Sequence, residues 1–242
     1  MSAIPLCVSF ARKDEARLAG ARWSPREHVW TCAASLLRSR AYSSLQPFVP
    51  LMYRPELAPP FIRPELVPQP LWGRNLRVLL SREEWDAVRR HTYAEAGYRC
   101  RVCGGRGPQW PVEADETWEY DEYALRHTLK GVVALCPDCH SVRHWGKTMV
   151  DGREGEAYDK MIAVNSCARE IAENIVKLAF EQWERRSGLV WSSDYSWIEQ
   201  THGIKLDPDA THRAESVNRE LVSKAIEATQ DDVAEPDLKE EC

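Results

Sequence analysis

Two Cys-x-x-Cys pairs constrain the fold of this chain more than any other feature. The first is 100-CRVC-103, and the second, 136-CPDC-139, follows after 32 intervening residues. Each short loop directs two thiolates toward one centre, and two such loops supply the tetrahedral set that Zn²⁺ prefers. Two matched pairs are less typical of ordinary buried cysteines or a redox pair. The sequence therefore predicts a structural zinc ion on Cys100, Cys103, Cys136 and Cys139.

The composition favours a folded protein in a reducing compartment. Hydrophobic residues make up 43% of the 242 positions, and ten are tryptophan, which is enough for a core. The N-terminus lacks a signal-peptide pattern, and no apolar run reaches the roughly 18 residues of a membrane span. We therefore expect a cytoplasmic protein without membrane contact. Cys7, Cys32, Cys167 and Cys242 are predicted to be free thiols.

The formal net charge of −5 is unevenly distributed. Residues 207–242 hold eleven acidic and four basic side chains, a balance of −7, so residues 1–206 hold 26 and 28, a balance of +2. Because the body is near neutral, net charge neither predicts nor excludes a nucleic-acid partner. Residues 207–242 are interpreted as an acidic, disordered tail with one short helix near 214–228.

Residues 1–46 are predicted to form a small β-α-β-β domain. An apolar strand at 6–10 precedes a short helix at 13–18, Gly20 fits a left-handed helix cap, and a turn at 24–27 joins two short strands. Residues 5–36 resemble a small bacterial domain of unknown function, which implies no chemistry. Trp23 and Trp30 are expected in its core rather than as a base-stacking platform.

A proline-rich segment, residues 47–75, follows. More than half of the fifteen prolines lie here, and Arg-Pro-Glu-Leu occurs at 54–57 and again at 63–66. Prolines lack amide donors and favour polyproline II, so this segment is predicted to be a semi-rigid linker. The next domain, 76–150, opens with a helix from Ser81, where Glu84 completes a capping box and Gly97 ends the helix.

A second metal-binding pattern follows the second cysteine pair. His140 and His144 are four residues apart, so on a helix they face the same side and can bind one further metal ion. Strand-like segments at 111–116 and 129–135 precede that helix. The predicted order is strand, hairpin, strand, helix, with metal ligands between them.

This arrangement resembles the HNH (His-Me finger, ββα-metal) endonucleases. The similarity covers roughly 71–200, and its matching segments are 71–77, 98–108, 111–113, 118–121 and 135–140. The resemblance implies metal-dependent hydrolysis of phosphodiester bonds in DNA. It also implies Mg²⁺, Mn²⁺ or Ni²⁺ at His140 and His144, beside the structural Zn²⁺.

The sequence departs from the family at the catalytic histidine of the first strand. Residues 113–116 read Glu-Ala-Asp-Glu, and no histidine lies between His91 and His127. Asp115 or Glu116 is the candidate to bind metal or act as a weak base. His127 is an alternative substitute, although an exposed loop position is expected for it. The other interpretation is a non-catalytic module, derived from a nuclease, that binds DNA or protein.

Residues 151–206 are predicted to be a helical extension. Apolar residues recur at spacings of three to five between 158 and 186, which indicates one long amphipathic helix with a possible interruption at Asn165. Its stripe is either core or a surface for a protein partner, so an assembly subunit is a third functional hypothesis. The overall fold class is α+β.

Overall fold

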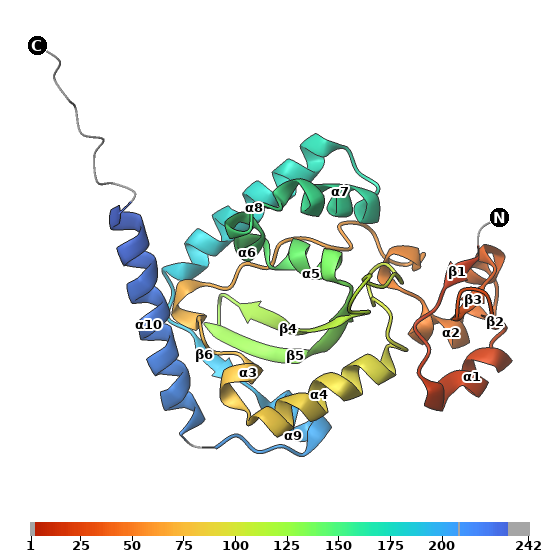
Figure 1. Cartoon of the computed structure of the whole chain (residues 1–242), viewed down its shortest axis with the longest axis horizontal. Coiled ribbons are helices and arrows are strands. Elements are labelled where there is room, and N and C mark those ends of the chain that lie inside the picture. Colours follow the sequence, from red (N-terminus) through yellow and green to blue (C-terminus); the bar gives the residue numbers. More distant parts are fainter. Residues whose placement is uncertain (1–2, 208, 232–242) are drawn as a thin grey trace, which may run out of the picture.

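The computed structural model describes residues 3–207 and 209–231. The chain is a mixture of helices and two three-stranded sheets, arranged around a long central hairpin (Figure 1). Within the described residues, no helix combines the length and the apolar character needed to cross a membrane.

The N-terminal sheet contains β1 (Ile4–Pro5), β2 (Arg22–Ser24) and β3 (Val29–Cys32), with α1 (Lys13–Leu18) between the first two. Its order is β1-β3-β2 and both pairings are antiparallel. The strand expected at 6–10 is not formed: β1 ends at Pro5, and a 3₁₀ turn begins at Phe10. Trp30 packs against the core of this region, but Trp23 is 47% exposed, so its predicted core position is wrong. Trp23 lies on the edge strand β2, where its ring contacts the rings of Trp30 and His28.

The proline-rich segment lies against the rest of the chain. It contains two short 3₁₀ turns, Leu51–Tyr53 and Gln69–Leu71, with extended backbone between them. The Leu51 amide donates to the Arg101 carbonyl at 2.9 Å. The buried Asn165 side chain accepts hydrogen bonds from the amides of Phe61 and Ile62 and donates to the Ile62 carbonyl. Residues far apart in sequence therefore hold this segment in place.

Two helices precede the hairpin, α3 (Leu76–Leu79) and α4 (Arg82–Glu95). The predicted capping box is present: the Ser81 hydroxyl accepts from the Glu84 amide, and the Glu84 carboxylate accepts from the Ser81 amide. The buried side chains of α4 include Trp85, Val88 and Thr92, one helical face. Gly97 follows at φ +59°, a conformation that favours glycine.

The central sheet is built from β4 (Glu113–Asp121), β5 (Arg126–Leu135) and β6 (Ser192–Asp194). β4 and β5 pair antiparallel, with a register shift at Thr117/Trp118, and β6 adds to β5 in parallel. Helices α4 and α9 (Ser196–His202) lie on one side of the hairpin in Figure 1, and α5 (Pro137–Arg143) lies on the other. β4 extends five residues beyond the expected strand end at 116.

The helical pattern predicted for 158–186 is broken after Asn165, the position where an interruption was expected. After α6 (Trp145–Val150), the chain forms α7 (Glu154–Asn165) and α8 (Arg169–Ser187). Ser166 has φ +50° and ends α7, because the Asn165 side chain binds the proline-rich segment there. The apolar stripe is partly core: Ala172 and Val176 are buried, whereas Ile171 and Leu178 are exposed.

The C-terminal helix is longer than the one expected near 214–228. α10 (Ala210–Asp231) packs through buried Ala210 and Ala214 against Leu79. Asn218 donates to the carbonyls of Gln69 and Trp72. The expectation of disorder from residue 207 is therefore wrong up to residue 231, because small apolar residues on one helical face meet α3. Residues 232–242 lie outside the described part of the chain.

Candidate metal centres

The four predicted zinc ligands meet at one point. Cys100 and Cys103 lie in the loop after α4, Cys136 caps the start of α5, and Cys139 lies in its first turn. All four sulfurs lie within 4.8 Å of one another, and the Sγ atoms of Cys103 and Cys136 are 3.7 Å apart. Zn–S bonds of about 2.3 Å in a tetrahedron place sulfurs about 3.8 Å apart. The four cysteines can therefore hold a metal such as zinc.

The surroundings of the four-cysteine group suit a closed, charged centre. Cys100, Cys136 and Cys139 are buried, and the Gly105 amide donates to Cys103 Sγ at 3.4 Å. Burial lowers the pKa of Lys160, but the neighbouring thiolates of Cys103, Cys139 and Cys136 outweigh that effect and raise it. A cation beside the group offsets the negative charge of clustered thiolates.

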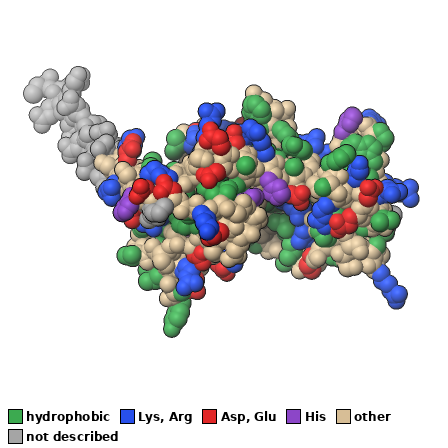
Figure 2. Space-filling model, turned by 90° about the horizontal axis from the view of Figure 1, so that it is seen from below, with side chains coloured by type: hydrophobic (Ala, Val, Ile, Leu, Met, Phe, Trp, Pro, Cys, Tyr) green, Lys and Arg blue, Asp and Glu red, His purple; other side chains and the backbone are tan. Residues whose placement is uncertain are grey.

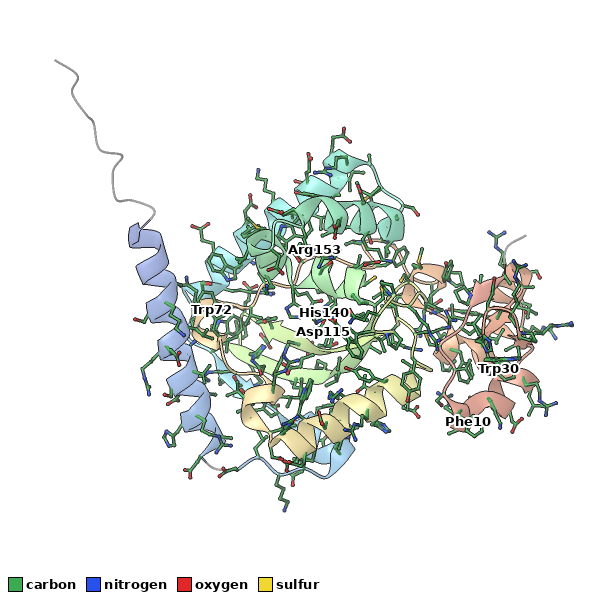
Figure 3. All side chains as sticks on the ribbon, in the orientation of Figure 1. Phe10, Trp30, Trp72, Asp115, His140 and Arg153 are labelled. Atoms are coloured by element: carbon green, nitrogen blue, oxygen red, sulfur yellow. The ribbon has the colours of Figure 1, made fainter. Side chains whose placement is uncertain are left out.

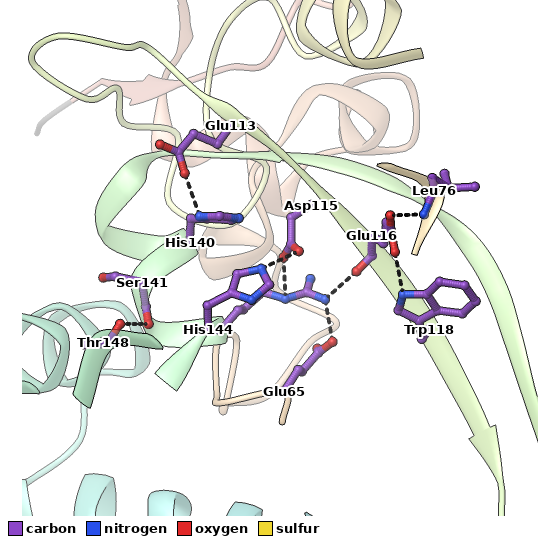
Figure 4. A network of polar contacts seen from close by, with 11 residues as sticks. Glu65, Leu76, Glu113, Asp115, Glu116, Trp118, His140, Ser141, His144 and Thr148 are labelled. Carbon is purple, nitrogen blue, oxygen red and sulfur yellow. Dashed lines mark hydrogen bonds and ion pairs between the residues drawn. The ribbon is translucent and has the colours of Figure 1, made fainter. Parts of the chain in front are cut away.

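The other predicted ligands form a second group, at the opposite end of α5. His140 lies in the last turn of α5, and His144 is its C-terminal cap. Asp115 on β4 faces them, and its Oδ1 lies 3.0 Å from His144 Nε2 (Figures 3 and 4). Asp115, His140 and His144 each offer one ligand atom within 4.8 Å of the others. One strand carboxylate and two helix imidazoles can therefore share one metal ion.

Glu113 orients His140 from the side. Its Oε2 lies 2.6 Å from His140 Nδ1 (Figure 4), and this hydrogen bond lowers the pKa of Glu113. A carboxylate on one ring nitrogen fixes the tautomer and leaves the other nitrogen as a metal ligand. Glu113 precedes Asp115 by two positions on β4, so alternation along the strand places both on the same face.

Arg143 holds Asp115 from within the protein. Its Nε lies 2.8 Å from Asp115 Oδ2, an ion pair whose N–H is not aligned as a hydrogen bond. Its Nη2 donates to Glu65 and, at 3.0 Å, to the Glu116 carbonyl. Burial opposes ionisation of Asp115, but the hydrogen bond with His144 and the charge of Arg143 outweigh it and lower the pKa of Asp115. Asp115 is thus held as a carboxylate.

Glu116 does not join this group. Its Oε1 accepts from the Leu76 amide at 2.7 Å and its Oε2 accepts from Trp118 Nε1 at 3.1 Å, on the side away from the histidines (Figure 4). Burial raises its pKa to about 7. Successive strand side chains alternate in direction, so neighbours such as Asp115 and Glu116 cannot both face α5. Glu116 therefore caps α3 at its N-terminus.

His127 is not an exposed loop residue, and that expectation is wrong. It lies on β5, is 1% exposed, and stacks on Trp118 with ring centroids 3.9 Å apart. Burial lowers its pKa to about 3, and neither ring nitrogen has a hydrogen-bond partner among the described residues. It is absent from the side chains that line the cleft at Asp115. The strand β5 extends through residues taken for a loop, which explains the error.

The second group opens into a cleft of about 540 Å³. The side chains of His140 and His144 are 27% and 44% exposed, whereas that of Asp115 is 7% exposed. Basic residues that also line the cleft are Arg77, Lys147 and Arg153. Acidic and basic side chains are interspersed on the face of the molecule in Figure 2. The group is therefore open to a ligand, in a cleft lined by both basic and acidic side chains.

Sequence reasoning missed Glu113, Arg143 and Glu65 as parts of this site. Arg143 was detectable, because it follows His140 by three positions and so lies on the same helical face. Glu113 was detectable from its two-residue spacing to Asp115. Glu65 had no such signal, since its position depends on how the proline-rich segment lies over α5.

Comparison with protein-family models, with curated proteins and with solved structures gives no match for this chain.

Proposed function

We propose that this protein is a metal-dependent phosphodiester hydrolase that acts on DNA, with zinc as the metal of the four-cysteine group. The observation that carries the proposal is the meeting of Asp115, His140 and His144 in an open cleft. Three protein ligands leave coordination positions free, as in catalytic metal sites. The order β4, β5, α5, with His140 and His144 at the end of α5, supports the proposal because it is the order expected from the resemblance of the sequence to the HNH endonucleases.

The residues of this site have three separate roles in the proposed hydrolysis: binding the metal ion, positioning its ligands and contacting the phosphates. A divalent ion bound there would polarise a phosphoryl oxygen and lower the pKa of a bound water. Asp115 and the two histidines would hold that ion, while Glu113 and Arg143 keep His140 and Asp115 in place. Arg77, Lys147 and Arg153 line the cleft and can meet phosphates there, with Lys147 exchanging its ion pair with Asp151 and Arg153 its ion pair with Glu156.

The proposal predicts weak activity. Glu116, the residue beside Asp115 on the strand, is turned away and bonded to Leu76 and Trp118. The histidines among the described side chains that line the cleft are His140 and His144, both in the metal group. Without an imidazole base, the rate is expected to be about 10²–10⁴ lower than with one.

Cleavage of supercoiled plasmid with Mg²⁺, Mn²⁺ or Ni²⁺ tests this function. We expect nicking that depends on the metal and is lost in His140→Ala, while the four-cysteine zinc remains. His212→Ala is the matched control, because His212 is 80% exposed on α10 and outside the cleft. Cutting that survives His140→Ala would contradict the assignment.

A second candidate function is a non-catalytic DNA-binding module. The observation that favours it is that Glu116 has a raised pKa and caps α3, while Glu113, the other strand carboxylate at the site, is bonded to His140. Metal-dependent binding of DNA, with no cutting under any of the three metals, would support this candidate. If the protein neither binds nor cuts DNA, both candidate functions are contradicted.

A further inference from the structure

An aromatic cavity adjoins the cleft on the side of His144. Its volume is about 230 Å³, and it shares Glu65, Val67, His144 and Lys147 with the metal cleft. Beyond those shared residues, its walls are mainly apolar: Leu66, Trp72, Gly146, Phe180 and Trp183. The cavity and the cleft therefore adjoin along these four residues, and a ligand at the metal group lies next to the cavity.

The aromatic walls are held by specific hydrogen bonds. Trp72 Nε1 and Trp183 Nε1 both donate to the Val67 carbonyl, at 2.8 and 3.0 Å. The Trp72 carbonyl accepts from Asn218 on α10 at 3.0 Å. Trp72 and Trp183, from segments more than a hundred residues apart, are thus fixed around one acceptor. A fixed aromatic wall loses little freedom when a flat ligand stacks on it.

We infer that this cavity receives an unpaired base of the nucleotide next to the phosphate at Asp115, His140 and His144, an inference that rests on the proposed function. The volume is below the roughly 300–1,000 Å³ of drug-sized sites, which suits a single ring system. Every base has a π face that stacks on indole or phenyl rings. Lys147, at the junction with the cleft, is ion-paired with Asp151, and an adjoining phosphate can take the place of that carboxylate.

A base can enter this cavity only from DNA in which that base is unpaired. In a duplex, the bases are stacked and paired, so entering the cavity requires an unpaired or extruded base. The protein should therefore prefer single-stranded or locally unpaired DNA over perfect duplex.

Gly146 offers a way to block the cavity without replacing a metal-binding side chain. It lies in α6, and a β-carbon added there would meet only Leu66 Cδ2, at 3.9 Å, an ordinary contact. The longer side chain of Gly146→Leu would fill the cavity. Gly155 in α7 is the matched control, because a β-carbon there meets nothing within 4 Å and it lies outside both spaces.

The experiment compares binding of short oligodeoxythymidine with an abasic oligomer of equal length and charge, by fluorescence anisotropy in Mn²⁺. The wild type and Gly155→Leu should bind the thymidine oligomer about 10-fold or more tightly than the abasic one. Gly146→Leu should bind the two oligomers equally. Trp183→Ala should also reduce the difference in affinity between the thymidine and abasic oligomers. This second variant keeps the test decisive if Gly146→Leu does not fold.

Failure of the two proposals can be told apart. A base preference without plasmid cutting under any metal would support the cavity and overturn the hydrolase. Plasmid cutting without a base preference in the wild type, or a preference retained in both cavity variants, would overturn the cavity alone. No binding of either oligomer would overturn the base-binding inference.

Discussion

The two candidate metal-binding groups share one helix, α5, yet differ in the residues that face them. Cys136 and Cys139 at its start meet a buried loop that supplies Cys100 and Cys103. His140 and His144 at its end meet β4, which supplies Asp115 beside an open cleft. Neighbouring residues such as Cys139 and His140 point in different directions around a helix. One short helix can therefore serve a closed centre and an open one.

This difference indicates that one group contributes to the stability of the fold and the other to the binding of a ligand. Four thiolates fill a tetrahedral shell and leave no position for a substrate, which is typical of structural zinc. Asp115 and two histidines leave positions free and lie on the surface of a cleft. We therefore expect the cysteine group to determine whether the centre of the molecule folds, and the histidine group to determine what it binds.

The largest effect is expected from the cysteine group. Cys136→Ser should remove zinc and unfold the region around α5, because structural zinc contributes about 10–16 kcal/mol of binding free energy to folding. Metal analysis and thermal unfolding measure this. Cys167→Ser is the control, since Cys167 is half-buried and outside the group. A folded, zinc-free Cys136→Ser protein would contradict this part of the account.

A smaller effect is expected from His127, which can be separated from both metal groups. Its pKa is about 3 in the folded protein, below the ordinary 6.5, so the unfolded chain binds more protons between these values. Stability is therefore complete above about pH 6.5 and falls as the pH drops. Between about pH 6.5 and 4.5, the wild type should lose about 2 kcal/mol that His127→Phe does not lose.

Denaturant unfolding at several pH values makes that comparison. Proton competition at cysteines and at His140 and His144 occurs in both proteins, so the difference between them isolates His127. If both proteins lose the same free energy of unfolding as the pH falls, the pKa of His127 is not lowered in the folded protein.

The smallest effect is expected at Glu113. Glu113→Gln should weaken binding of Mn²⁺ or Ni²⁺ at the second group about 10–100-fold, because an oriented histidine is a better ligand. The four-cysteine zinc and the unfolding temperature should be unchanged. Calorimetric titration measures the affinity, and Glu119→Gln is a matched control on the same strand, paired with Lys130 on the surface. If Glu119→Gln weakens metal binding as much as Glu113→Gln does, the loss of affinity comes from surface charge and not from the orientation of His140.

Several features were predictable because they depend on short spacings. The cysteine pairs, the histidines of α5 and the capping box at Ser81 each follow from local geometry. Asp115 was predicted as one of two strand carboxylates. Strand alternation alone could not select it over Glu116, since the direction of the strand relative to α5 comes from tertiary packing.

Other features depend on contacts between distant segments. The break between α7 and α8 follows from Asn165 binding residues about a hundred positions earlier. His127 is buried because Trp118 and Tyr120 pack on it across the hairpin. The aromatic cavity joins Trp72 to Trp183 through one carbonyl. Periodicity within a segment contains no information about such pairs.

The central claim is that α5 contributes to one closed and one open metal site. The most direct test is to count the metal ions bound by the wild type and by His144→Ala. Native mass spectrometry after dialysis, followed by titration with Mn²⁺, counts tightly held and exchangeable ions. We predict one retained zinc and one further Mn²⁺ in the wild type, and one retained zinc alone in His144→Ala. A wild type that binds no second ion, or a second ion that persists in His144→Ala, would contradict the account.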